Sequence, residues 1–120
     1  ASENEMPDVE VRYEDQMNIN EFGKLNNRLH EVQSDLKVVK ERLETLEDAT
    51  TELMMGGDTV RLKMGEAFFD CSEEYATEYC ERHQTTLGAQ LEALTAEEAK
   101  ILARQKHLKT QLYGRFGKAI

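Results

Sequence analysis

The stretch TVRLKMGEAFFDCS, Thr59–Ser72, decides the fold, because it interrupts a chain whose flanks both have the pattern of long helices. Apolar and basic side chains alternate over residues 60–64, which predicts a half-buried strand. Gly65-Glu66 fits a tight turn with glycine first, and Ala67–Cys71 has the composition of a return strand. We therefore expect a β-hairpin over residues 59–71.

The first predicted helix covers residues 15–55. From Phe22 onward its apolar side chains recur at alternating steps of three and four, a heptad pattern that Thr50 breaks. A stripe this narrow is buried only against another helix, and about 40 residues give a length of roughly 60 Å. Either Asp15 or Asn18 is expected to cap the start. The apolar positions are Phe22, Leu25, Leu29, Val32, Leu36, Val39, Leu43, Leu46 and Leu53.

The second predicted helix covers residues 72–117, with Ser72 as its N-cap. Its apolar stripe is weaker, because Gln84, Glu98 and Gln105 interrupt it. Two helices of similar length joined only by a hairpin are expected to fold back as an antiparallel coiled coil. The apolar positions are Cys80, Leu87, Leu91, Leu94, Ile101, Leu108 and Leu112.

Charge supports the antiparallel orientation. Residues 99–120 include Lys and Arg but no Asp or Glu. An antiparallel coil places this basic end beside the acidic start of the first helix, and although each exposed pair contributes little, together they favour the arrangement. The acids expected near the basic end are Glu14, Asp15, Glu21 and Glu31.

The hairpin predicts association with other chains. A lone two-stranded hairpin is marginally stable in water, and unpaired strand edges with apolar side chains promote association. We expect hairpins of several subunits to join into a shared sheet or barrel, because closure removes the edges. The alternative is that these side chains cover the ends of the chain's own helices. The residues expected to drive assembly are Val60, Leu62, Met64, Phe68 and Phe69.

Composition argues against several classes of partner. The formal net charge of −9 disfavours nucleic acid, and no apolar run approaches the length of a membrane span. Residues 1–14 have the polar, acidic composition of a flexible tail, which leaves 15–120 as one domain. The start of the sequence lacks the features of a signal peptide, so we expect a cytoplasmic protein with free thiols.

Neither a metal site nor an enzyme is predicted. Cys71, Cys80 and His83 lack a Cys-x-x-Cys pair and an obvious fourth ligand. The carboxylates are spread along helix faces, and no Gly-rich phosphate loop occurs. We expect no catalytic residue, no metal and no cofactor.

Three segments resemble β-type prefoldin subunits. YEDQMNINEFGKLNNRLHEV, Tyr13–Val32, is similar to the start of their first helix. LKMGEAFFDCS, Leu62–Ser72, resembles their hairpin, and a single hairpin is the β-type pattern. QLYGRFG, Gln111–Gly117, is similar to the end of the second helix in the subunit-4 group of that family. The likeness covers nearly the whole chain.

The resemblance implies a mainly helical subunit of a heterohexamer, with two α-type and three further β-type subunits as partners. It implies that the hairpins form an intersubunit β-barrel from which the coiled coils project. The family captures unfolded actin and tubulin chains and passes them to the cytosolic chaperonin without ATP. The implied location is the cytoplasm, with the nucleus as a second compartment.

Client binding by such a subunit is expected at the free end of the coiled coil, where the last turns fray. The alternative for Phe22, Leu25, Leu108 and Leu112 is an ordinary role in the apolar seam. The residues expected to contact clients are Met17, Ile19, Phe22, Leu25, Leu108, Leu112, Tyr113 and Phe116.

The alternative function is that of a coiled-coil structural or adaptor protein that mediates oligomerisation. The hairpin favours the chaperone subunit, because an adaptor coil would join its helices with a simple loop.

Overall fold

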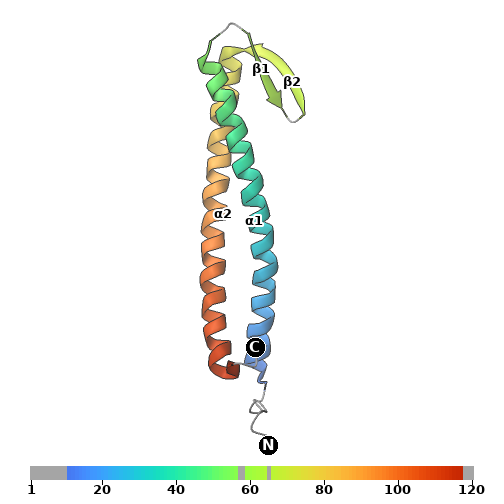
Figure 1. Cartoon of the computed structure of the whole chain (residues 1–120), viewed down its shortest axis with the longest axis vertical. Helices are drawn as coiled ribbons and strands as arrows, with labels where there is room; N and C mark the ends of the chain where they lie inside the picture. Colours follow the sequence, from blue (N-terminus) through green and yellow to red (C-terminus); the bar gives the residue numbers. More distant parts are fainter. Residues whose placement is uncertain (1–10, 57–58, 65, 118–120) are drawn as a thin grey trace, which may run out of the picture. The chain divides into compact units, whose positions relative to one another are not determined.

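The computed structural model describes residues 11–56, 59–64 and 66–117, with only the backbone given at 59–60 and 63–64 (Figure 1). The described chain consists of two long helices joined by an antiparallel β-hairpin, which confirms the predicted fold of the subunit. In chain order the elements are α1 (Tyr13–Met54), β1 (Thr59–Met64), β2 (Ala67–Ser72) and α2 (Glu73–Phe116).

The start of α1 differs from the expectation. The helix begins at Tyr13, and the carbonyl of Arg12 accepts the first helical hydrogen bond, from the N–H of Gln16. Arg12 is therefore the N-cap, and the predicted caps, Asp15 and Asn18, are both wrong. The Asp15 carboxylate instead reaches back and accepts the backbone N–H of Arg12 at 2.9 Å, as the acidic residue of a capping box does. Of the expected tail, 1–14, residues 1–10 lie outside the described chain.

The end of α1 is closed by Gly56. The N–H groups of Met55 and Gly56 bond to the carbonyls of Glu52 and Leu53, which tightens the last turn. Gly56 then adopts φ 86°, a left-handed conformation that glycine takes without steric cost.

The hairpin has the predicted tight turn. Met64 pairs with Ala67, so two residues connect the strands, of which Gly65 lies outside the described chain. β2 continues through Ser72, one residue beyond the expected end. The Ser72 hydroxyl accepts the backbone N–H of Tyr75 at 3.2 Å, which confirms Ser72 as the N-cap of α2.

The chain divides into two compact units. The end unit comprises Ala1–Gln33 and Ala96–Ile120, and the hairpin unit comprises Ser34–Thr95. Within each unit α1 and α2 lie side by side (Figure 1). The division falls inside the region 15–120 that the sequence analysis assigns to one domain.

The core of the hairpin unit includes a residue from the hairpin itself. Leu62 of β1 is only 3% exposed and belongs to one apolar cluster with side chains of both helices. The remaining buried members of the cluster are Val39, Leu46, Cys80 and Leu87. Burial among these residues raises the pKa of the Cys80 thiol. One face of the hairpin is therefore anchored on the helices of its own chain.

The apolar stripes of α1 and α2 form the seam that their spacing predicts. In the end unit, both stripes supply buried side chains, among which Val32 and Leu108 are completely enclosed. The buried apolar residues of this unit are Leu29, Val32, Ile101, Leu108 and Leu112.

The polar interruptions of the seam fall into three cases. Gln84 donates to Thr50, the residue that breaks the stripe of α1, at 3.5 Å. Glu98 accepts a hydrogen bond from the side chain of Gln33 on α1 at 3.3 Å. Gln105 is buried, and its Nε2 has no hydrogen-bond partner among the described residues.

Leu62→Ala tests the anchoring of the hairpin. Removal of a buried leucine side chain leaves a cavity, so the free energy of unfolding of the chain should fall by about 2–5 kcal/mol. Urea unfolding followed by circular dichroism measures this change. Phe68→Ala is the matched control on the same hairpin, because Phe68 is exposed, and it should change stability by less than about 0.5 kcal/mol. Equal losses in the two variants would contradict the assignment of Leu62 to the core.

Candidate functional site

The end unit contains an apolar groove between the first turns of α1 and the last turns of α2. Its volume is about 250 Å³, and it is lined by Ile19, Phe22, Lys109, Leu112 and Tyr113. Residues three or four apart lie on one face of a helix, which is why α1 and α2 each present a row of side chains here. We call this feature the end groove.

Exposure divides the residues that the sequence analysis assigns to client contact. Ile19 is 41% exposed and Tyr113 is 56% exposed, and Met17 also lies at the surface. Phe22, Leu25 and Phe116 are half-buried. Leu108 and Leu112 are buried in the seam, so their side chains support the groove from below rather than offering a free surface.

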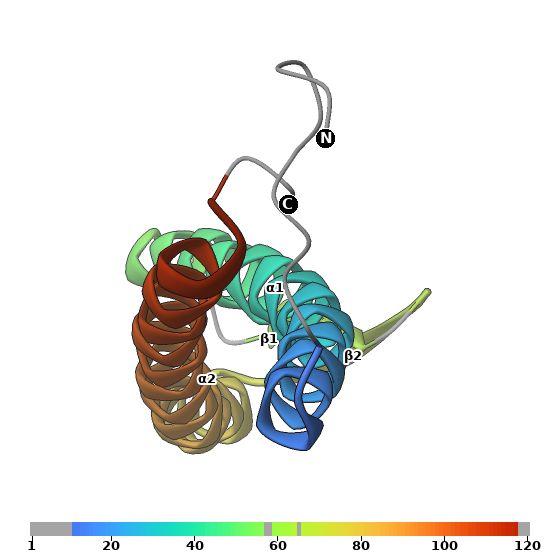
Figure 2. The ribbon, with the colours of Figure 1, turned by 90° about the horizontal axis from the view of Figure 1, so that it is seen from below.

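A partly buried ion pair fixes the last turn of α2 to the first turn of α1. Arg115 Nη2 lies 2.7 Å from Asp15 Oδ2, and Arg115 Nε lies 3.1 Å from Asp15 Oδ1. The hydrogen bond from Arg115, with that from the backbone of Arg12, lowers the pKa of Asp15 from 3.8 to about 2. Asp15 thus serves both the helix start and the helix pairing. Figure 2 shows this end of the chain, with the start of α1 in blue and the end of α2 in red.

Two further bidentate pairs link the helices in the end unit. Arg104 donates to Glu21 at 2.6 and 2.9 Å, and Arg28 donates to Glu97 at 2.6 and 2.7 Å. These bonds lower the pKa of both carboxyl groups. Asp15 and Glu21 therefore confirm the expected pairing of the acidic start of α1 with the basic end of α2.

Lys109 is the groove residue that the sequence analysis does not single out. Its Nζ lies over the ring of Phe22, 5.7 Å from the ring centroid, within cation–π range. The sequence could have indicated this role, because Lys109 is three residues before Leu112 and four before Tyr113. That spacing places all three on one face of α2.

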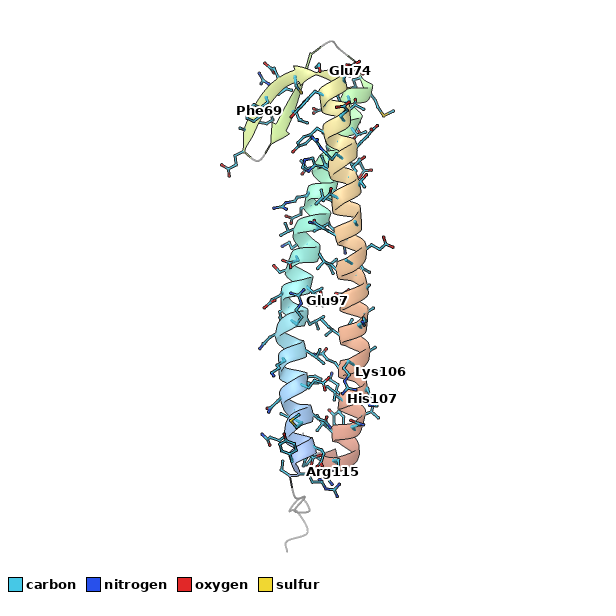
Figure 3. All side chains as sticks on the ribbon, turned by 180° about the vertical axis from the view of Figure 1, so that it is seen from behind. Phe69, Glu74, Glu97, Lys106, His107 and Arg115 are labelled. Atoms are coloured by element: carbon cyan, nitrogen blue, oxygen red, sulfur yellow. The ribbon has the colours of Figure 1, made fainter. Side chains whose placement is uncertain are left out.

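The hairpin presents the second candidate surface. Phe68 is 60% exposed and Phe69 is 51% exposed, and Figure 3 labels Phe69 on the hairpin and Arg115 near the end of α2. The face opposite Leu62 carries Phe68 together with an exposed pair between Arg61 and Asp70 at 3.5 Å. Among the other residues assigned to assembly, Leu62 is buried against the helices of its own chain. For this residue the alternative expectation, that the hairpin covers the chain's own helices, is the one that agrees with the structure. The side chains of Val60 and Met64 lie outside the described residues.

A wider groove lies in the hairpin unit. Its volume is about 530 Å³, and its walls include Val38, Tyr79, His83 and Leu87. The rings of Tyr79 and His83 lie against each other at a tilt of 36°, with centroids 4.2 Å apart. Among the described residues, no group of three or more His, Cys, Asp or Glu side chains is arranged to hold a metal ion. Neither described helix has an apolar stretch long enough to cross a bilayer.

Comparison with known proteins decides the family. The family model described as "Prefoldin subunit" matches residues 16–119. The chain belongs to the prefoldin subunit family. It is 33% identical over 116 residues to prefoldin subunit 4 of Homo sapiens, covering 94% of this chain and 87% of the human protein. It is 34% identical over 118 residues to the probable prefoldin subunit 4 of Dictyostelium discoideum, covering 97% and 89%.

A solved structure supports the same fold. The prefoldin β subunit from Thermococcus strain KS-1 superposes with a TM-score of 0.76 at 19% identity, covering 92% of this chain and 98% of that chain. The resemblance stated from the three sequence segments is thereby confirmed. As a prefoldin subunit, the chain is a component of the prefoldin chaperone and assembles with other prefoldin subunits.

The ion pair between Asp15 and Arg115 predicts a pH dependence of this prefoldin chain. Because the pKa of Asp15 is about 2 in the folded chain and 3.8 ordinarily, its stabilising effect is complete above about pH 4. That effect is lost as the pH falls toward 2. Asp15→Asn should therefore lower Tm at pH 7, and the difference from the unchanged chain should shrink steadily between pH 4 and pH 2.

Thermal melting by circular dichroism across this range measures the effect. Glu14→Gln is the matched control, because Glu14 is an exposed neighbour without an ion pair in the described part of the chain. A Tm difference for Asp15→Asn that stays constant from pH 7 to pH 2 would contradict the stabilising role of the pair.

Proposed function

We propose that this chain is a β-type subunit of a heterohexameric prefoldin, with two α-type and three further β-type subunits as partners. It holds unfolded proteins, of the actin and tubulin kind, without ATP and transfers them to the cytosolic chaperonin. The proposed compartment is the cytoplasm, with the nucleus as a second location. Membership of the prefoldin family favours this function over that of a coiled-coil adaptor.

The end groove is the observation that carries the proposed holdase function. A holdase needs apolar surface that remains exposed in the folded protein, and Ile19 and Tyr113 provide it on the two sides of the groove. Met17 adds a flexible and polarisable side chain nearby, which suits clients of varied shape. Leu108 and Leu112 hold the helices together beneath this surface. We assign client contact to the exposed members of the predicted set.

Several weak contacts are sufficient for capture. When one unfolded chain touches several arms of an assembly, the second and later contacts form at a high effective concentration. Each groove therefore needs only modest affinity, which also permits release. A shallow groove with exposed walls fits this requirement better than a closed apolar cavity.

The exposed phenylalanines of the hairpin support the proposed assembly surface. Leu62 fixes one face of the hairpin on the helices of its own chain, while Phe68 and Phe69 remain largely uncovered. The two-stranded sheet also leaves the outer edges of β1 and β2 unpaired within the described chain. Hairpins of neighbouring subunits would cover the rings and complete the ladders in an intersubunit barrel.

Substitution of Ile19 and Tyr113 by Ser tests client binding. Loss of about 1.4 kcal/mol of apolar burial weakens the contact of this arm about tenfold. In assembled prefoldin, the variant should suppress aggregation of chemically denatured actin less well, as measured by light scattering. Leu102→Ser is the matched control, because Leu102 is an exposed apolar residue of the end unit that does not line the groove. Unchanged suppression by an intact assembly would reject this role.

Substitution of Phe68 and Phe69 by Ser tests assembly. Both side chains are exposed in the isolated chain, so circular dichroism should show unchanged helicity. Native mass spectrometry of a mixture with the partner subunits should show loss of the hexamer, because two aromatic side chains no longer become buried. Leu102→Ser serves again as the control outside the hairpin. A hexamer of normal mass and stability with both phenylalanines replaced would refute the assembly role.

A further inference from the structure

The lysines beside the end groove differ from the arginines of the same region in their ion pairing. Arg104 and Arg115 are held by Glu21 and Asp15 in bidentate ion pairs. Lys106 and Lys109 are exposed, and within the described part of the chain neither forms an ion pair with a carboxylate. Lys109 lines the groove, and Lys106 precedes it by three residues on the same face of α2.

The surroundings of the groove leave this positive charge largely uncompensated. None of the lining residues is acidic, and the sequence from Ala99 to Ile120 contains no Asp or Glu. On α1, Asp15 and Glu21 are already engaged by arginines. The whole chain has a net charge of −9. At physiological ionic strength, however, charges more than about 8 Å away are largely screened, so the lysines dominate at the groove.

The apolar lining of the end groove lies next to the positive charge of Lys109. The ammonium of Lys109 already lies over the ring of Phe22, so a side chain that enters the groove comes close to the positive charge. The groove volume of about 250 Å³ is below the roughly 300–1,000 Å³ of common small-molecule sites, which suits single side chains of an extended polypeptide.

We propose that the end groove prefers unfolded segments in which a large apolar side chain is followed or preceded within about three residues by Asp or Glu. The apolar side chain occupies the groove between Ile19 and Tyr113, and the carboxylate pairs with Lys109, with Lys106 as a second cation. This inference rests on the proposed function of client capture and specifies the class of client segment that this subunit selects.

Binding of short peptides to the full 120-residue chain tests the preference. The probes are fluorescein-labelled, twelve-residue Gly-Ser peptides that contain one Phe flanked by Asp, by Asn or by Lys. Fluorescence anisotropy measures their dissociation constants. The Asp peptide should bind about two- to fivefold more tightly than the Asn peptide, the usual range for one exposed charge pair, and the Lys peptide more weakly still. The advantage of the Asp peptide should decrease as salt is added.

Charge reversal locates the preference on the chain. Lys109→Glu should favour the Lys peptide over the Asp peptide, and Lys106→Glu should reduce the advantage of the Asp peptide without reversing it. Lys100→Glu is the matched control, because Lys100 is an exposed lysine of α2 outside the groove, and it should leave the order of affinities unchanged.

The outcomes separate this inference from the function on which it rests. Equal affinities for the three peptides, or an order that Lys109→Glu leaves unchanged, would overturn the charge preference. If Ile19→Ser with Tyr113→Ser then still weakened all peptides and impaired holdase activity, the proposed function would stand alone. If those two substitutions left both peptide binding and holdase activity intact, the groove would have neither role.

Discussion

The burial of Leu62 against α1 and α2 is the contact on which the rest of the hairpin unit depends. Because side chains alternate along a strand, anchoring the face that carries Leu62 turns the face that carries Phe68 outward. Phe69, which pairs with Leu62 across the ladder, remains half uncovered. The chain therefore covers the face of its sheet that carries Leu62 and leaves the face that carries Phe68 exposed.

In the end unit, the two basic residue types have different roles. The planar guanidinium groups of Arg104 and Arg115 match carboxylates in two-point contacts and fix the helices to each other. Lysine presents a compact charge on a flexible stem, and Lys109 remains at the surface over Phe22. The same basic segment of α2 thus contains both the arginines that clamp the helices together and the lysine that lines the end groove.

Regular spacing made the helices, the hairpin, the Ser72 cap and most of the seam predictable, since each follows from local sequence. The burial of Leu62 against the helices could not be predicted, because alternation defines the two faces of a strand but does not say which face the helices cover. The start of α1 was misplaced, because several polar residues there are compatible with a cap and the contact with Arg115 is distant in sequence. Lys109 was overlooked as a groove residue, because the sequence of α2 alone does not distinguish it from the neighbouring lysines. What distinguishes it is its contact with Phe22 of α1.

The amide of Gln105 has a consequence for motion. In the closed seam its Nε2 has no hydrogen-bond partner among the residues that the structure describes, whereas water would satisfy it once the helices part. When α1 and α2 separate at Gln105, the side chain therefore gains a hydrogen bond to water. Separation at Ile101 or Leu108 gains no such bond, because those side chains are apolar. Opening of the seam at Gln105 should therefore cost less free energy than opening of an all-leucine seam would, and it would uncover the neighbouring apolar side chains.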